Sequence, residues 1–138
     1  MSETGIVVEP RVFTVAREAG VTLVGEVWDP VGPDGLETEP RDELLMLHGG
    51  AQTRHAWTRA ARRLATEGYR VTSMDARGHG DSDWDPEGDY DIHRMAEDLE
   101  EIVAQRFPDR RPVIVGASLG GLTAMVALGH GKDVARAL

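Results

Sequence analysis

The chain has 138 residues, of which 41% are hydrophobic and 28% charged, the balance of a soluble globular domain that can bury one modest core. Fifteen Lys and Arg against 24 Asp and Glu give a formal net charge of −9, which repels nucleic acid, anionic membrane surfaces and polyanionic substrates. The absence of cysteine excludes disulfides and thiolate catalysis.

The N-terminal residues Met1 to Gly5 are polar and acidic, without the basic and apolar regions of a signal peptide. No apolar run approaches the length that crosses a membrane. We therefore expect a cytoplasmic protein that has no membrane partner.

The first predicted element is a hairpin. Residues 12–16 and 21–28 are rich in β-branched and aromatic side chains, and Glu18, Ala19 and Gly20 supply a turn between them. A loop rich in proline, glycine and acidic residues follows over residues 30–43, and we expect it to lie on the surface.

A continuous apolar run at 44–47 then predicts a strand buried on both faces, as in a parallel sheet. A helix is expected from about Thr53, its N-cap, to Gly68, with an apolar stripe on one face and arginines toward water. The stripe contains Trp57, Ala61, Leu64 and Ala65, and the arginines are Arg59, Arg62 and Arg63. Residues 70–75 predict the next strand.

The second half of the chain predicts a helix from about Asp91 to Pro108, a third buried strand at 112–116 and a helix at 119–128. In the first helix one face is apolar, and the acidic residues, Asp98 among them, fall mostly elsewhere. The last helix is apolar almost all round, which favours an interior position.

Strands and helices that alternate at this spacing indicate a parallel sheet with right-handed crossovers. The fold class expected is α/β, with a predominantly parallel sheet, an N-terminal antiparallel hairpin and flanking helices. Residues 135–138 resemble the approach to another strand, and the strand at 112–116 would be left with an exposed edge. Residues 1–138 are therefore interpreted as a single incomplete domain.

A G-x-S-x-G pattern between a predicted strand and a predicted helix indicates a catalytic serine; its residues are Gly116-Ala117-Ser118-Leu119-Gly120. A serine on such a sharp turn has a strained backbone, and the glycines two positions to either side leave room for it. Ser118 is the candidate nucleophile.

Two backbone N–H groups are candidates for stabilising an oxyanion beside this serine. Leu119 N–H begins the helix after Ser118, where free N–H groups and the positive end of the helix dipole lie. The second donor is expected from the loop after residues 44–47, with Gly50 as the candidate and Ala51 next. Gly49 supports this turn, and His48 is interpreted as a hydrogen-bonded structural residue because its spacing gives no reason to name it the base.

Three segments in this order resemble the α/β-hydrolase superfamily, in its branch with a serine nucleophile. They are Leu47-His48-Gly49-Gly50, the segment from Asp75 to Ser82, and the segment from Gly116 to Gly121. The resemblance implies an α/β-hydrolase fold and a serine hydrolase acting on an ester-type or related acyl bond through an acyl-enzyme, without a cofactor. It also implies that the segment from Asp75 to Ser82 shapes the rim of the sheet, so that Asp75 is not the triad acid.

The resemblance implies a triad acid after the sixth or seventh strand, a histidine after the eighth and a cap beyond the sixth, and none of that region is present in this chain. Serine in place of aspartate argues against epoxide-hydrolase and haloalkane-dehalogenase chemistry, whereas cofactor-free haloperoxidase and C–C hydrolase relatives stay open. The other histidines, among them His55, His93 and His130, have no metal-site spacing.

A second hypothesis is that the chain itself is inactive, either a truncated product or a binding and assembly module that associates with itself or with a complementary C-terminal polypeptide. On the first hypothesis its partner is a small acyl substrate, and on neither hypothesis is nucleic acid expected. The sequence does not separate these two.

Overall fold

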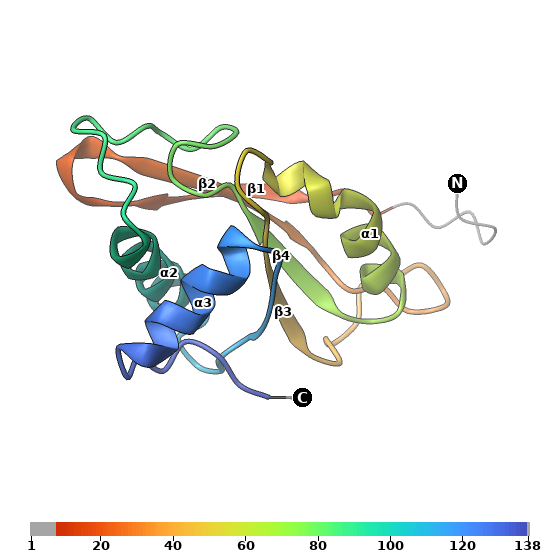
Figure 1. Ribbon diagram of the computed structural model, residues 1–138. Coiled ribbons are helices and arrows are strands. Elements are labelled where there is room, and N and C mark those ends of the chain that lie inside the picture. Colours follow the sequence, from red (N-terminus) through yellow and green to blue (C-terminus); the bar gives the residue numbers. More distant parts are fainter. Residues whose placement is uncertain (1–7, 138) are drawn as a thin grey trace.

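The computed structural model describes residues 8–137, and its N-terminal part is an antiparallel pair of strands (Figure 1). Strand β1, Arg11–Ala16, pairs with β2, Thr22–Trp28, so that Arg11 lies opposite Val27. The connection is the short 3-10 segment Glu18–Gly20, in which Ala19 and Gly20 have φ angles of 59° and 74°. The predicted hairpin and its turn are confirmed.

The hairpin continues into a mixed sheet of five strands. Strands β3, Glu43–Leu47, β4, Arg70–Met74, and β5, Val113–Gly116, complete the order β1-β2-β4-β3-β5. Strand β3 runs parallel to both β4 and β5, and β2 runs antiparallel to β4. The parallel part that the sequence predicts is therefore built from β3, β4 and β5, with the hairpin added at one edge.

Helices cover both faces of this sheet (Figure 1). Helix α1, Thr58–Thr66, follows a 3-10 turn at Arg54–Trp57 and packs on one face, whereas α2, Ile92–Arg106, and α3, Leu119–Gly129, pack on the other. Strand β3 serves both layers because its side chains alternate: Leu45 and Leu47 belong to the core under α2 and α3, and Leu44 and Met46 to the core under α1. The strand is buried on both faces, as predicted.

Two predictions about burial are wrong for residues 8–137. Helix α3 is not interior, because the side chains of Leu122, Met125 and Leu128 are 50–67% exposed. Strand β5 is not buried, because its Val115 is 36% exposed; it pairs only with β3 and so leaves the exposed edge that the sequence predicts. The apolar composition of these elements predicts that they avoid water, but no element within residues 8–137 covers these particular side chains. Residues 132–137 form neither helix nor strand, and the last residue of the predicted further strand, Leu138, lies outside the described residues.

The parallel strands bring three loops to one edge of the sheet. Leu47 at the end of β3 lies opposite both Met74 of β4 and Gly116 of β5. The segments that follow these strands, which begin at His48, Asp75 and Ala117, therefore leave the sheet side by side. This edge carries the candidate site.

None of the helices in residues 8–137 has the length and apolar content needed to cross a bilayer.

A buried ion cluster joins the loop after β4 to α2. Arg77 is 1% exposed, and its Nε and Nη2 donate to the carboxylate of Asp98 at 2.9 and 2.7 Å. The remaining Arg77 nitrogen, Nη1, binds Asp85 at 2.8 Å, and Arg17 from the hairpin donates to Asp98 at 2.9 Å. Asp98 was expected on the solvated side of its helix, and its burial is a correction: a carboxylate can face the core when two arginines compensate its charge.

Removing this charge is expected to destabilise the fold. Asp98→Asn removes the carboxylate that two arginines share and leaves the buried Arg77 with Asp85 as its charged partner, and we expect a loss of about 3 kcal/mol in the free energy of unfolding, measured by urea denaturation. The matched control is Glu67→Gln, which breaks the exposed pair between Arg63 and Glu67 and should cost less than about 0.5 kcal/mol. Equal losses in the two variants would contradict the role given to burial.

Candidate active site

Ser118 sits on a strained turn between β5 and α3. Its φ of 51° and ψ of −110° lie outside the regions that a side chain with a Cβ normally adopts, and the residue is exposed. Such a conformation costs on the order of 1–3 kcal/mol and persists only where the surroundings enforce it. The backbone thereby holds the hydroxyl out from the edge of the sheet.

The glycines two residues before and after Ser118 are required by close backbone contacts. A Cβ at Gly116 would lie 2.5 Å from Gly121 N, and a Cβ at Gly120 would overlap the carbonyl group of Leu47. The first turn of α3 thus packs directly against the ends of β3 and β5. This contact is the steric reason for the G-x-S-x-G spacing.

Two N–H groups lie without a protein acceptor at this turn. Within residues 8–137, neither Leu119 N–H, the first of α3, nor Gly50 N–H donates a hydrogen bond to another residue. Ala51 N–H, the alternative donor considered from the sequence, is occupied because it donates to His79 Nε2 at 3.1 Å. The hydrogen bonding therefore leaves Gly50, and not Ala51, able to bind a ligand.

The loop that carries Gly50 is a tight turn packed against the serine. Gln52 N–H donates to Gly49 O at 3.2 Å, and Ala51 at the third position of the turn has a φ of 63°. An alanine in this left-handed region costs about 1–2 kcal/mol. A Cβ at Gly49 would lie 3.6 Å from Ser118 Cβ, and one at Gly50 would lie 3.9 Å from Leu119 Cδ2. The turn and the serine are direct neighbours.

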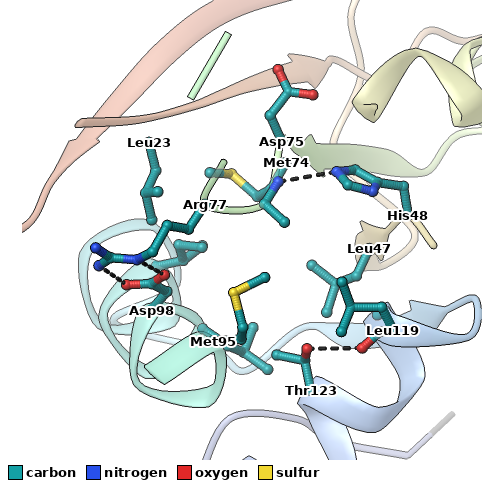
Figure 2. A pocket seen from close by; sticks show the side chains of 14 residues that line it. Leu23, Leu47, His48, Met74, Asp75, Arg77, Met95, Asp98, Leu119 and Thr123 are labelled. Atoms are coloured by element: carbon teal, nitrogen blue, oxygen red, sulfur yellow. Dashed lines mark hydrogen bonds and ion pairs between the residues drawn. The ribbon is translucent and has the colours of Figure 1, made fainter. Parts of the chain in front are cut away.

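His48 is held as a neutral, structural side chain, in agreement with its interpretation from the sequence. It is 2% exposed, its Nδ1 lies 2.8 Å from Gly49 O, and its Nε2 accepts from Ala76 N–H at 3.0 Å (Figure 2). Because Gly49 O can only accept and Ala76 N–H can only donate, the proton must be on Nδ1. Burial, which disfavours the charged ring, lowers the pKa of His48.

Asp75 anchors the loop after β4. Its carboxylate is fully buried, accepts Arg54 N–H at 2.7 Å and Asp81 N–H at 3.0 Å, and is paired with the Arg54 guanidinium. Gly80 packs so closely on this carboxylate that any side chain there would overlap it. These bonds occupy Asp75 in holding the loop, which supports the reading that it is not the triad acid.

Arg54 is a residue of this cluster that sequence reasoning missed. Burial by itself would lower the pKa of its guanidinium, but the carboxylates of Asp81, Asp75 and Glu26 outweigh burial and raise it. The hydrogen bond that the Arg54 guanidinium donates to the Asp81 carboxylate lowers the pKa of Asp81. The sequence did contain a signal for this pair. Asp75 follows the buried strand β4 and needs a positive partner, and Arg54 lies in the segment that follows the neighbouring strand β3.

Comparisons with known proteins agree with this geometry. The family model for the alpha/beta hydrolase fold matches residues 43–138, more than half of the chain. The chain belongs to the α/β-hydrolase family. It is 30% identical over 109 residues to a monoacylglycerol lipase of Mycolicibacterium smegmatis, an alignment that covers 77% of this chain and 37% of the lipase. It is 35% identical over 82 residues to esterase Rv0045c of Mycobacterium tuberculosis, covering 59% of this chain and 26% of the esterase.

A solved α/β hydrolase from Novosphingobium aromaticivorans superposes with a TM-score of 0.73 at 28% identity, covering 93% of this chain and 42% of that protein. The chain thus matches well under half the length of these relatives. The predicted α/β-hydrolase fold is confirmed.

The histidine that follows Ser118 in this α/β-hydrolase chain is not at the serine. His130 caps the far end of the 11-residue helix α3, about 16 Å along its axis, and its Nε2 lies 2.9 Å from His93 Nδ1. Within residues 8–137, no side chain hydrogen-bonds to Ser118 Oγ, and no three His, Cys, Asp or Glu side chains gather as a metal site. The described residues bring together the serine and two N–H groups.

A small cavity lies beneath the turn that carries Ser118, between the ends of β3 and β4 and helices α2 and α3 (Figure 2). Its volume is about 40 Å³, and the Arg77–Asp98 ion pair and His48 contribute to its wall. Asp75 also lines it, and the rest of the wall is mostly apolar: Leu23, Leu47, Met74, Ala76, Met95, Leu99, Ile102, Leu119, Gly120 and Thr123. The space suits one or a few small molecules such as water and is too small for an acyl chain.

The two adjacent glycines of α3 should respond oppositely to substitution by alanine. Gly120→Ala forces a methyl group onto the Leu47 carbonyl, and we expect a loss of about 2 kcal/mol or more in the free energy of unfolding. At Gly121 a Cβ would lie 3.4 Å from Gly116 O, so Gly121→Ala should be neutral or stabilising by up to about 1 kcal/mol through helix propensity. Thermal denaturation of both variants is the measurement, and a tolerated Gly120→Ala would contradict the packing.

Proposed function

We propose that the protein hydrolyses an ester or a related acyl bond through a covalent acyl-enzyme on Ser118. The observation that carries the proposal is the exposed serine on its strained turn, beside two N–H groups that have no protein acceptor within residues 8–137. Relatives named as a monoacylglycerol lipase and an esterase support acyl esters as the substrate class.

In the proposed reaction Ser118 Oγ attacks the carbonyl carbon, and its proton passes to a base. The carbonyl oxygen becomes an anion that Leu119 N–H and Gly50 N–H bind, and the alcohol or thiol leaves with a proton returned by the base. Water then attacks the acyl-enzyme, releases the acid and restores the serine. Each well-placed donor contributes about 10²–10³-fold to the rate.

The base and its acid partner are expected from polypeptide outside residues 1–138, in line with the greater length of the relatives. Loss of the base of a triad costs about 10⁶-fold in kcat. Activity is therefore to be measured on the natural assembly, by which we mean these residues together with the polypeptide that supplies the base.

The proposal predicts two distinct effects on the hydrolysis of p-nitrophenyl acetate. Ser118→Ala should abolish both turnover and labelling by a fluorophosphonate probe, because the attacking oxygen is gone. Gly50→Pro should lower kcat/KM by about 10²–10³-fold, because proline has no N–H to bind the oxyanion.

The matched control for the second variant is Gly50→Ala, which keeps the N–H and has ordinary contact space, since a Cβ there would lie 3.9 Å from Leu119 Cδ2. Gly50 is not among the residues with positive φ, and the second position of the turn accepts proline. A folded natural assembly that the probe does not label would contradict Ser118 as the nucleophile. Equal activity of Gly50→Pro and Gly50→Ala would contradict Gly50 as a donor.

The exposed faces of α3 and β5 favour a second candidate function, an assembly role. Leu122, Met125 and Leu128 form an apolar stripe on α3 that is at least half exposed, and β5 has an unpaired edge within residues 8–137. Contiguous exposed apolar surface beside an open strand edge is typical of an interaction site. We propose that this face binds another polypeptide, either a second copy or a complementary C-terminal one.

Association of the 138-residue chain should therefore depend on this stripe. We expect dimers or larger species by light scattering, and Met125→Lys should shift them toward the monomer because it places a charge on the stripe. Leu36→Lys is the control, because Leu36 is a loop residue that is also 67% exposed. A monomeric wild-type chain would contradict self-association through this face.

A further inference from the structure

Two loops at the candidate site exchange hydrogen bonds through two histidines. His48, after β3, accepts Ala76 N–H from the loop after β4 at 3.0 Å, and His79, in that loop, accepts Ala51 N–H from the turn after β3 at 3.1 Å. The two rings are neighbours, with centroids 5.1 Å apart. Each loop therefore supplies the acceptor that holds one N–H of the other.

The His79 ring is oriented for this contact. Its Nδ1 lies 3.0 Å from Arg77 O, and because a carbonyl oxygen only accepts, the proton is on Nδ1 and Nε2 presents its lone pair to Ala51 N–H. His79 N–H also donates to Ala76 O at 2.9 Å, and Ser82 N–H donates to His79 O at 3.1 Å. Ring and backbone are thus fixed by their own loop.

The two partners of this bond differ in rigidity. The loop of His79 is anchored by the buried carboxylate of Asp75 on one side and by the buried pair of Arg77 and Asp98 on the other. The turn of Ala51 is closed by Gln52 N–H to Gly49 O and by Gly49 N–H to Gln52 Oε1 at 3.0 Å, with no buried ion pair from residues 8–137 to hold it, and its central peptide requires a positive φ at an alanine. The rigid loop therefore fixes the strained turn, and not the reverse.

Gly50 precedes Ala51 in this turn and is the proposed oxyanion donor. We propose that His79 is a positioning residue: by holding Ala51 N–H it fixes the turn that places Gly50 N–H beside Ser118. The inference rests on the proposed function, and it adds a role for a side chain that has no place in the acyl-transfer steps themselves. Because it fixes an N–H that binds only the developing oxyanion, its loss should lower kcat more than it changes KM.

The test uses His79→Gln and His79→Met, two unbranched side chains of similar length. Oε1 of Gln can accept Ala51 N–H at the place of Nε2, and the thioether of Met is at most a weak acceptor. On p-nitrophenyl acetate, the natural assembly carrying His79→Met should lose about tenfold to a hundredfold in kcat with little change in KM, and His79→Gln should keep most of its activity. Adding Ala51→Gly to His79→Met should restore part of kcat, because glycine adopts the turn without strain.

A second measurement needs no activity. In the ¹⁵N-labelled protein, a scalar coupling between Ala51 N and His79 Nε2 across the hydrogen bond is expected, and amide shifts of Gly50 and Ala51 should change more in His79→Met than in His79→Gln. Absence of the coupling would overturn the proposal, and so would equal kcat values for the two variants. An inactive wild-type assembly that shows the coupling and these shift changes would contradict acyl transfer while supporting the positioning of the turn by His79.

Discussion

The close contact between the first turn of α3 and the end of β3 is the constraint on which the site depends. The carbonyl oxygen of Leu47 accepts Ala117 N–H at 3.0 Å, and the same carbonyl group leaves no space for a side chain at Gly120. Strand and helix therefore approach one another as bare backbone, and the chain between them has to turn within very few residues. The left-handed φ of Ser118 is the consequence of that approach, and the exposure of its side chain follows from it.

Much of the fold could be predicted because its signals are local. The hairpin, the strands of the parallel part and the caps Thr53 and Asp91 follow from patterns within a few residues, although Thr53 caps a 3-10 turn and α1 begins only at Thr58. The glycine spacing around Ser118 reports a contact with an adjacent strand. Ion-pair partners that lie far apart in the sequence gave no such local signal. Asp98 looks like one of several solvated acidic residues on α2 until the fold brings Arg77 and Arg17 to it. Likewise, the composition of α3 indicates aversion to water but not which element covers it.

The site could be predicted only in part, for the same reason. Gly50 and Leu119 were predicted as donors from their places in motifs, because backbone N–H groups at strand ends and helix starts have positions that sequence alone defines. The preference for Gly50 over Ala51 had no basis in residue type, since both residues are small. The physical reason for the preference is His79, a residue 28 positions further along the chain that accepts the hydrogen bond of Ala51 N–H.

Two strained residues, Ser118 and Ala51, lie in the two turns that form this site, and their cost has to be offset by neighbouring structure. The charged clusters around Asp75 and Arg77 are suited to that purpose. Buried ion pairs add little net stability, but breaking one is costly, so they restrict a loop to a single arrangement. The segment between β4 and α2 contains neither helix nor strand, yet these pairs fix it to α2 on one side and to Arg54 on the other. The otherwise irregular loop can then serve as the rigid wall against which the strained turn is held.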